Sequence, residues 1–130
     1  KKLNLPSFVV LTGSELTVDS ALMFGADGVI PGIGNIDPAG YVKIYDLVSS
    51  GDYLAARKEQ ERLFAMFGLV DVGASDRMGR GSSAIGAFKA ALKLLGIIED
   101  ARTAPPAIAL NENEVAAIKP FLTQAGLNLK

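Results

Sequence analysis

The sequence contains no cysteine, no histidine and no tryptophan, and aromatic residues make up only 7% of it. The absence of cysteine excludes disulfide bonds, thiolate metal sites and a cysteine nucleophile. The absence of histidine removes the commonest general base and the commonest zinc ligand. Side-chain chemistry therefore depends on Lys, Arg, Asp, Glu, Ser, Thr and Tyr, and we expect neither a metal site nor a cofactor.

Neither sign of charge dominates, and long apolar runs are missing. Thirteen Lys and Arg residues stand against 14 Asp and Glu residues, which gives a net charge of −1. A nucleic-acid-binding domain normally carries a basic face, so we expect no nucleic-acid partner. Apolar runs such as residues 8–11 fall far short of the ~20 residues that span a bilayer. The N-terminus lacks the apolar stretch of a signal peptide, and we expect a cytoplasmic protein with no membrane segment.

Half of the residues are apolar (49%), which is typical of a folded chain of about one domain. The first fifty residues predict strand, helix and strand. Residues 8–11 are apolar and β-branched, as in a parallel strand that is buried on both faces. Residues 16–24 predict a helix that stops at Gly25, and residues 28–30 predict a second strand. Together they predict a βαβ unit with parallel strands.

The remaining residues predict helices. Asp37 as a cap and Pro38 in the first turn predict a helix that ends near Gly51, and Asp52 caps the next. We expect that next helix to bury one apolar side and to expose one polar side: the buried side comprises Leu54, Ala55, Leu63, Phe64, Met66 and Phe67, and the solvated side Arg57, Lys58, Glu59, Glu61 and Arg62.

The segment 71–83 is rich in glycine and serine and predicts a loop. A strongly apolar helix should begin at Ser82 or Ser83 and bury the residues that recur at helical spacing, namely Ile85, Phe88, Leu92, Leu95 and Ile98. Asn111 with Glu114 forms a capping box for a last helix. Pro120 should kink or restart that helix.

Two strands do not make an independently stable sheet, so the sequence predicts part of a larger α/β fold. Its segments 10–15, 25–30 and 51–57, with Asn35 before Pro38, resemble the end of the barrel in the dihydrodipicolinate synthase / N-acetylneuraminate lyase family. Residues 89–96 resemble its C-terminal helix, followed by Pro105-Pro106. The order and spacing of these short motifs match over essentially the whole chain.

The resemblance implies an α/β fold, the C-terminal part of a (β/α)8 TIM barrel with strands 7 and 8, followed by a C-terminal helical extension. We expect residues 1–50 to hold the last two βα units and residues 51–130 to hold the C-terminal helices, as one partial domain.

The family contains class I, Schiff-base aldolases and lyases that hold pyruvate or a related 2-keto acid as an imine on a lysine at the end of strand six. The resemblance places this lysine and the proton-shuttling tyrosine before residue 1, with Lys1 and Lys2 in a preceding helix or loop. We therefore expect no catalytic residue in this chain and no activity from it alone.

The expected reaction makes or breaks a C–C bond, or dehydrates, at a 2-keto acid, with an aldehyde or keto-acid co-substrate. The family implies a homo-oligomer, a tetramer of full-length chains, or association with the missing barrel half. The alternative is a non-enzymatic half-barrel or helical interaction module that self-associates.

The resemblance assigns substrate binding to Gly13, Ser14, Glu15, Ile30 and Gly32, because barrel active sites lie at the C-terminal ends of the strands. Gly13 would let substrate approach the backbone closely. Glu15 matches the acidic residue that binds substrate hydroxyls in the lyases acting on sialic acid. The Ile30 carbonyl matches one that faces the lysine, and Gly32 matches a position that is serine in some members. Alternatively, Gly13 and Gly32 form strand-end turns and Ile30 belongs to the core.

Other charged residues have simpler interpretations. Lys89 and Lys93 are expected to be solvated, since a reactive lysine needs desolvation. The loop that contains Arg77 and Arg80 lacks the sequence of a phosphate-binding loop; we expect it near the barrel mouth or an interface, with the arginines within reach of a substrate carboxylate. Asp27 is expected to hydrogen-bond its own backbone in a turn.

Overall fold

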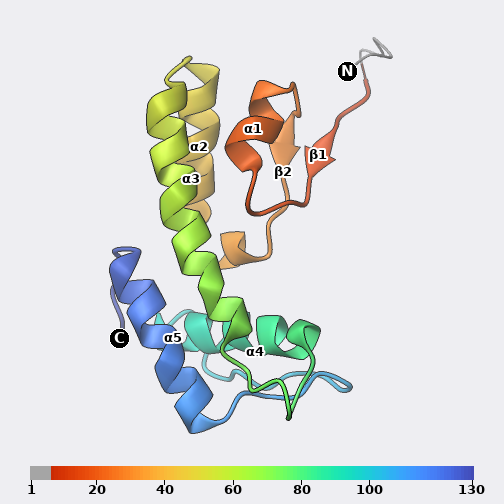
Figure 1. Cartoon of the computed structure of the whole chain (residues 1–130), viewed down its shortest axis with the longest axis vertical. Helices are drawn as coiled ribbons and strands as arrows, with labels where there is room; N and C mark the ends of the chain where they lie inside the picture. Colours follow the sequence, from red (N-terminus) through yellow and green to blue (C-terminus); the bar gives the residue numbers. More distant parts are fainter. Residues whose placement is uncertain (1–6) are drawn as a thin grey trace. The chain divides into compact units, whose positions relative to one another are not determined.

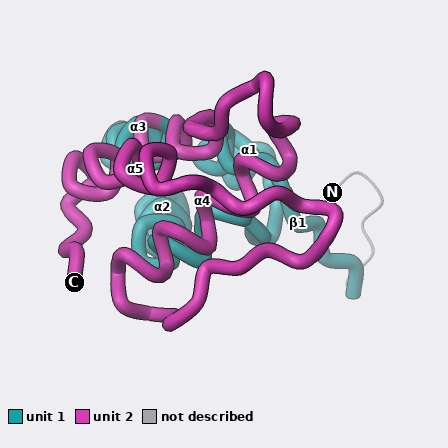
Figure 2. Tube along the Cα trace, turned by 90° about the horizontal axis from the view of Figure 1, so that it is seen from below, with its two compact units in different colours: residues 1–64 teal, residues 65–130 magenta. Residues whose placement is uncertain are grey.

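The computed structural model describes residues 7–130, and Figure 1 shows the order of the elements. The chain divides into two compact units, residues 1–64 and residues 65–130, coloured teal and magenta in Figure 2. The boundary falls within helix α3 (Tyr53–Phe67). The expected place of Lys1 and Lys2 lies outside the described residues.

The first unit begins with the predicted βαβ arrangement. Strand β1 (Leu11–Thr12), helix α1 (Val18–Met23) and strand β2 (Gly28–Val29) follow one another. The strands are parallel, with Leu11 opposite Gly28 and Thr12 opposite Val29. Gly25 takes a left-handed conformation (φ +93°) just beyond α1, where a residue without a Cβ is favoured. The parallel unit is confirmed, although each element is shorter than predicted.

The expected burial of the first strand on both faces is wrong for this chain. Phe8, Val9, Val10 and Leu11 are 53, 62, 39 and 49% exposed. A parallel strand is buried only where further strands and covering helices surround it, and the sheet of residues 7–130 has two strands. These apolar side chains therefore form an open surface.

Two long helices complete the first unit, after a short 3-10 turn, η1 (Ile33–Asn35). The Asp37 side chain caps α2 (Pro38–Ser49) by accepting from the Gly40 N–H at 3.0 Å. Asp52 caps α3 in the same way, by accepting from the Ala55 N–H at 3.1 Å. Both predicted caps are confirmed. The apolar core of this unit is made of Val18, Leu22, Ile33, Ile36, Tyr41, Ile44, Ala56 and Leu63.

Helix α3 buries only part of its predicted apolar side. Leu63 and Met66 are 1% exposed, as predicted, but Leu54 and Phe64 are 80 and 57% exposed, and Glu59 and Gln60 are buried instead. Glu59 lies in ion pairs with Lys43 of α2 at 2.9 Å and with Arg62. Burial opposes ionisation of Glu59, but hydrogen bonds from Arg62 and Lys43 and their charges outweigh it, so its pKa is lowered. Of the polar side that was expected to be solvated, Arg57, Lys58 and Glu61 are exposed, whereas Glu59 is buried in its ion pair with Arg62.

The second unit contains η2 (Gly68–Asp71), α4 (Arg80–Leu94) and α5 (Glu112–Gln124). The predicted loop is therefore shorter, because residues 80–83 belong to α4. The expected apolar stripe is also wrong: Ile85 is 46% exposed, and Phe88, Leu92 and Ile98 are only partly buried, whereas Leu95 is buried. The buried face of α4 consists of Ser83, Gly86, Ala87, Ala90 and Ala91, small residues that let neighbouring segments approach closely.

The capping box of α5 is confirmed. The Asn111 side chain accepts from the Glu114 N–H at 3.0 Å, and the Glu114 carboxylate accepts from the Asn111 N–H at 2.8 Å. Pro120 does not restart the helix, which continues to Gln124. One proline removes a single backbone donor, and the Thr123 hydroxyl donates to the Lys119 carbonyl at 2.9 Å in the next turn. In residues 7–130, no helix is long and apolar enough to cross a membrane.

Candidate functional site

The segments that follow the two strands meet at one edge of the sheet. Because β1 and β2 are parallel, their carboxyl ends lie at the same edge. The Glu15 carboxylate Oε2, after β1, accepts from the Ile33 N–H, after β2, at 2.9 Å. The structure therefore connects the segment of Glu15 with the segment that contains Gly32 and Ile33.

The backbone of Glu15 is held from two helices. Its carbonyl oxygen accepts from the Gln60 side-chain Nε2 at 3.0 Å and from the Tyr41 hydroxyl at 3.4 Å. Burial, and then the charges of Glu15 and Asp37, raise the pKa of Tyr41, so the phenol stays protonated and remains a donor. Neither Tyr41 nor Gln60 was predicted from the sequence, since each is separated from Glu15 by more than two dozen residues.

Gly13 and Ser14 lie in the exposed turn after β1. A Cβ built on Gly13 would meet no atom within 4 Å, so no described neighbour requires glycine there and the space beside its backbone is open. The Ser14 hydroxyl accepts from the Thr17 hydroxyl at 2.8 Å, and the Ser14 N–H donates to the Thr12 hydroxyl at 3.1 Å. Ser14 thus has local partners that maintain the turn.

Ile30 and Gly32 differ in their surroundings. Ile30 is 69% exposed, so the alternative that it belongs to the core is wrong for this chain. It lies on an apolar groove of about 490 Å³ lined by Val29, Ile30, Pro31, Gly34, Asn35, Pro38, Tyr41, Val42 and Tyr45. The Gly32 carbonyl accepts from the Asn35 side chain at 2.8 Å, which gives Gly32 a part in forming η1.

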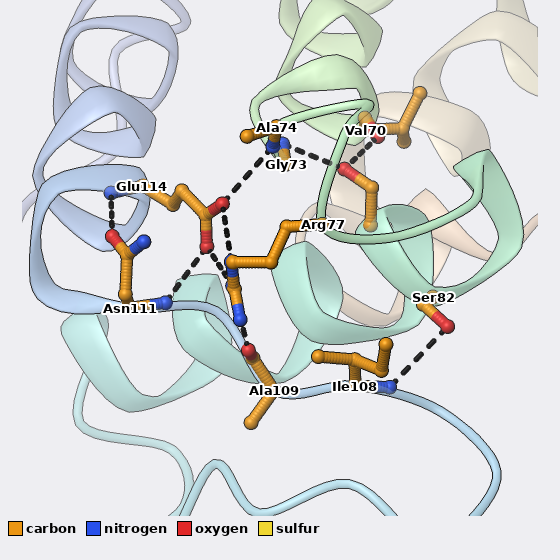
Figure 3. A network of polar contacts seen from close by, with 10 residues as sticks. Val70, Gly73, Ala74, Arg77, Ser82, Ile108, Ala109, Asn111 and Glu114 are labelled. Atoms are coloured by element: carbon orange, nitrogen blue, oxygen red, sulfur yellow. Dashed lines mark hydrogen bonds and ion pairs between the residues drawn. The ribbon is translucent and has the colours of Figure 1, made fainter.

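The arginines of the 72–79 loop and its flank already have internal partners. Arg77 pairs with Glu114 and donates to the Ala109 carbonyl at 3.0 Å (Figure 3). Arg80 pairs with Asp71 at 2.6 Å and lies over the Phe67 ring, 6.0 Å from its centroid. The same Glu114 carboxylate accepts from the Ala74 N–H at 3.0 Å. These contacts hold the loop against the start of α5.

Asp27 hydrogen-bonds to Val10, the residue before strand β1. Its Oδ2 accepts from the Val10 N–H at 2.8 Å, and its own N–H donates to the Val10 carbonyl at 2.7 Å. Asp27 therefore extends the pairing of the two strands by one residue.

Lys93 lies beside a separate groove of about 340 Å³, which is also lined by Asp100 and Arg102. Within residues 7–130, no three His, Cys, Asp or Glu side chains lie together as a metal site requires.

Comparison with known proteins gives one consistent result. The model of the dihydrodipicolinate synthetase family matches residues 1–125. The 4-hydroxy-tetrahydrodipicolinate synthase of Desulfotalea psychrophila is 29% identical over 122 residues, which are 94% of this chain and 37% of the relative. That of Methanothermobacter thermautotrophicus is 33% identical over 64 residues, 49% of this chain and 23% of the relative.

Solved structures agree with the sequence comparison. The dihydrodipicolinate synthase of Bacteroides thetaiotaomicron has a TM-score of 0.82 at 28% identity, covering 93% of this chain and 39% of its own. A prophage protein of the same family from E. coli K12, solved in complex with pyruvate, has a TM-score of 0.78 at 26% identity. The match covers 95% of this chain and 39% of the E. coli protein. The chain thus spans well under half the length of these relatives. By its sequence match and its backbone alike, it belongs to the dihydrodipicolinate synthetase family.

Proposed function

We propose that the full-length protein carrying this chain is a class I, pyruvate-dependent aldolase or lyase, and that residues 7–35 supply one edge of its substrate site as strands 7 and 8 of the barrel. The observation that carries the proposal is the Glu15–Ile33 hydrogen bond of 2.9 Å, which joins the two strand-end segments in which the expected substrate contacts lie. Family membership, and the pyruvate complex of the E. coli relative, support it.

In such an enzyme a lysine amine adds to the keto carbon, water leaves, and a protonated imine results. The imine accepts the electron pair that is released when a bond at the adjacent carbon breaks, and returns it when the bond forms. We place this lysine, and the tyrosine that shuttles protons, N-terminal to residue 1. The domain assignment of residues 1–50 to barrel units and 51–130 to C-terminal helices belongs to the same proposal, as does the tetramer.

The residues of this chain then bind substrate rather than react with it. Gly13 leaves open space beside its backbone for the keto acid. Glu15 uses Oε2 for Ile33, and in this proposal its other oxygen accepts a hydrogen bond from a hydroxyl of the aldehyde or keto-acid co-substrate. The Ile30 carbonyl faces the imine, while Ser14 and Gly32 contribute at the margin of the site.

Reductive trapping tests this function. The full-length protein is treated with borohydride, with and without pyruvate, and digested for peptide mass spectrometry. We expect a pyruvate-dependent adduct on one lysine outside residues 1–130, and no adduct or turnover from 1–130 alone. Lys89→Arg and Lys93→Arg should retain the adduct. A full-length protein with no adduct would contradict the proposal, and an adduct within 1–130 would require a different catalytic lysine.

The exposed apolar surface favours a second candidate. Phe24 and Val9 are 87 and 62% exposed, as in a surface that binds another polypeptide. A half-barrel interaction module without enzymatic activity would bind through this surface and form no pyruvate adduct. The same trapping experiment therefore separates the two functions.

A further inference from the structure

The side-chain amide of Gln60, on α3, contacts two segments of the first unit at once. Its Oε1 accepts from the Val18 N–H at 2.8 Å and from the Asp19 N–H at 3.3 Å, at the start of α1. Its Nε2 donates to the Glu15 carbonyl at 3.0 Å. Gln60 is only 1% exposed, so water does not replace these partners.

The partners fix the orientation of this amide. The N–H groups of Val18 and Asp19 can only donate, and the Glu15 carbonyl can only accept. A flipped amide would turn its NH₂ group towards the Val18 and Asp19 N–H groups and its oxygen towards the Glu15 carbonyl. Donors would then face donors and acceptors would face acceptors, which is costly for buried groups. The Gln60 NH₂ group therefore faces Glu15. Among side chains of similar size, an ionised Glu keeps only the acceptor and Met keeps neither function.

We propose that Gln60 is a positioning residue for substrate binding, because it fixes the Glu15 main chain from which the carboxylate reaches Ile33 and the co-substrate. This inference rests on the proposed function. The Tyr41 hydroxyl contacts the same carbonyl at 3.4 Å, which is long for an O–H donor. Gln60 thus makes the stronger of the two side-chain contacts to that carbonyl.

Gln60→Glu separates positioning from simple capping of α1. When ionised, the carboxylate still accepts from the Val18 and Asp19 N–H groups but cannot donate to the Glu15 carbonyl, so it repels that oxygen. If Gln60 only caps α1, the variant behaves like the wild type. If Gln60 positions Glu15, the Glu15–Ile33 bond weakens although Gln60 touches neither the Glu15 carboxylate nor Ile33.

Amide hydrogen exchange in the full-length protein measures this directly. In Gln60→Glu we expect the Ile33 amide to exchange about tenfold faster, as for loss of one hydrogen bond to a charged group, while Val18 and Asp19 stay protected. Unchanged exchange at Ile33 overturns the proposal. If this variant does not fold, Gln60→Met is used, which removes both the donor and the acceptor at similar volume. The amides of Val18, Asp19 and Ile33 should then all exchange faster. An Ile33 amide that stays protected again overturns the proposal.

Steady-state kinetics give the second readout. In Gln60→Glu we expect KM for a hydroxyl-bearing aldehyde co-substrate to rise about tenfold, with the yield of borohydride-trapped pyruvate adduct unchanged. Ser83→Ala serves as the matched control, since its buried hydroxyl bonds Val70 and Gly73 and lies in the other unit; neither KM nor Ile33 exchange should change. A KM equal to wild type overturns the proposal. Absence of the adduct in the wild type would contradict only the proposed function, because the exchange experiment stands without activity.

Discussion

Glu114, in the first turn of α5, connects the 72–79 loop to the start of that helix. Its carboxylate accepts from Arg77, from the Ala74 N–H and from the Asn111 N–H (Figure 3). The hydrogen bond from Arg77 lowers its pKa most, burial opposes the change, and the two backbone N–H groups lower it further, from 4.5 to about 2. The folded state therefore binds this proton more weakly than the unfolded chain does.

The sign of the pH dependence follows from that shift. The stabilisation from Glu114 is fully present above pH 4.5 and is lost as the pH falls from there towards about 2. We expect Glu114→Gln to lower the free energy of unfolding by about 1–3 kcal/mol at pH 7 and to flatten its dependence on pH in that range. Urea unfolding at several pH values measures both effects.

Glu112 provides the matched control, because it is exposed in the first turn of the same helix. Glu112→Gln should change the free energy of unfolding by less than about 0.5 kcal/mol. Equal pH profiles for wild type and Glu114→Gln would show that the carboxylate contributes no net stability to the loop.

The site was only partly predictable because some of its contacts join residues that are far apart in the sequence. Glu15 and Gly32 were proposed as site residues because the family resemblance matches them to segments that follow two strands, and strand ends are visible in the local pattern. Gln60 and Tyr41 carry no such signal: Gln60 lies among charged residues on a helix that predicts a solvated face, and Tyr41 matches an ordinary core position. Only the folded chain brings their side chains to the Glu15 carbonyl.

At the scale of the element, caps were predictable and faces were not. Asp37, Asp52 and Asn111 act within three residues of their partners, so the sequence alone determines them. The buried side of a helix depends on what packs against it. Apolar periodicity favoured Ile85, Phe88 and Leu92 for α4, whereas the fold buries its small residues.

Substitutions in α4 test this assignment of faces. Ala87 is 0% exposed and Ile85 is 46% exposed. We expect Ala87→Leu to lower the free energy of unfolding by about 1–3 kcal/mol through overpacking, and Ile85→Ala to lower it by less than about 1 kcal/mol. Thermal unfolding of the two variants measures the difference. The reverse order would indicate that α4 buries its large apolar side chains after all.

At the scale of the whole chain, the open surface of the first unit has a consequence for assembly. The side chains of Phe8, Val9, Phe24 and Ile30 are all more than half exposed, and strand β1 pairs only with β2 among the described residues. Exposed apolar strands promote association with other chains. The chain spans 37% of its Desulfotalea relative and 39% of its Bacteroides relative, and the proposal that it is part of a barrel predicts that further strands cover this surface.

Residues 1–130 produced alone should therefore self-associate, with a sedimentation coefficient that rises with protein concentration. Phe24→Ser combined with Val9→Lys should shift the population towards monomer, because the two changes remove exposed apolar side chains and place a charge just before the edge strand β1, where it discourages pairing. Ile97→Lys is the matched control: Ile97 is 60% exposed but belongs to the other unit, and its replacement should leave self-association unchanged. A wild-type chain that remains monomeric at every concentration would show that these apolar residues need no cover, and the inferred barrel contact would lose its physical basis.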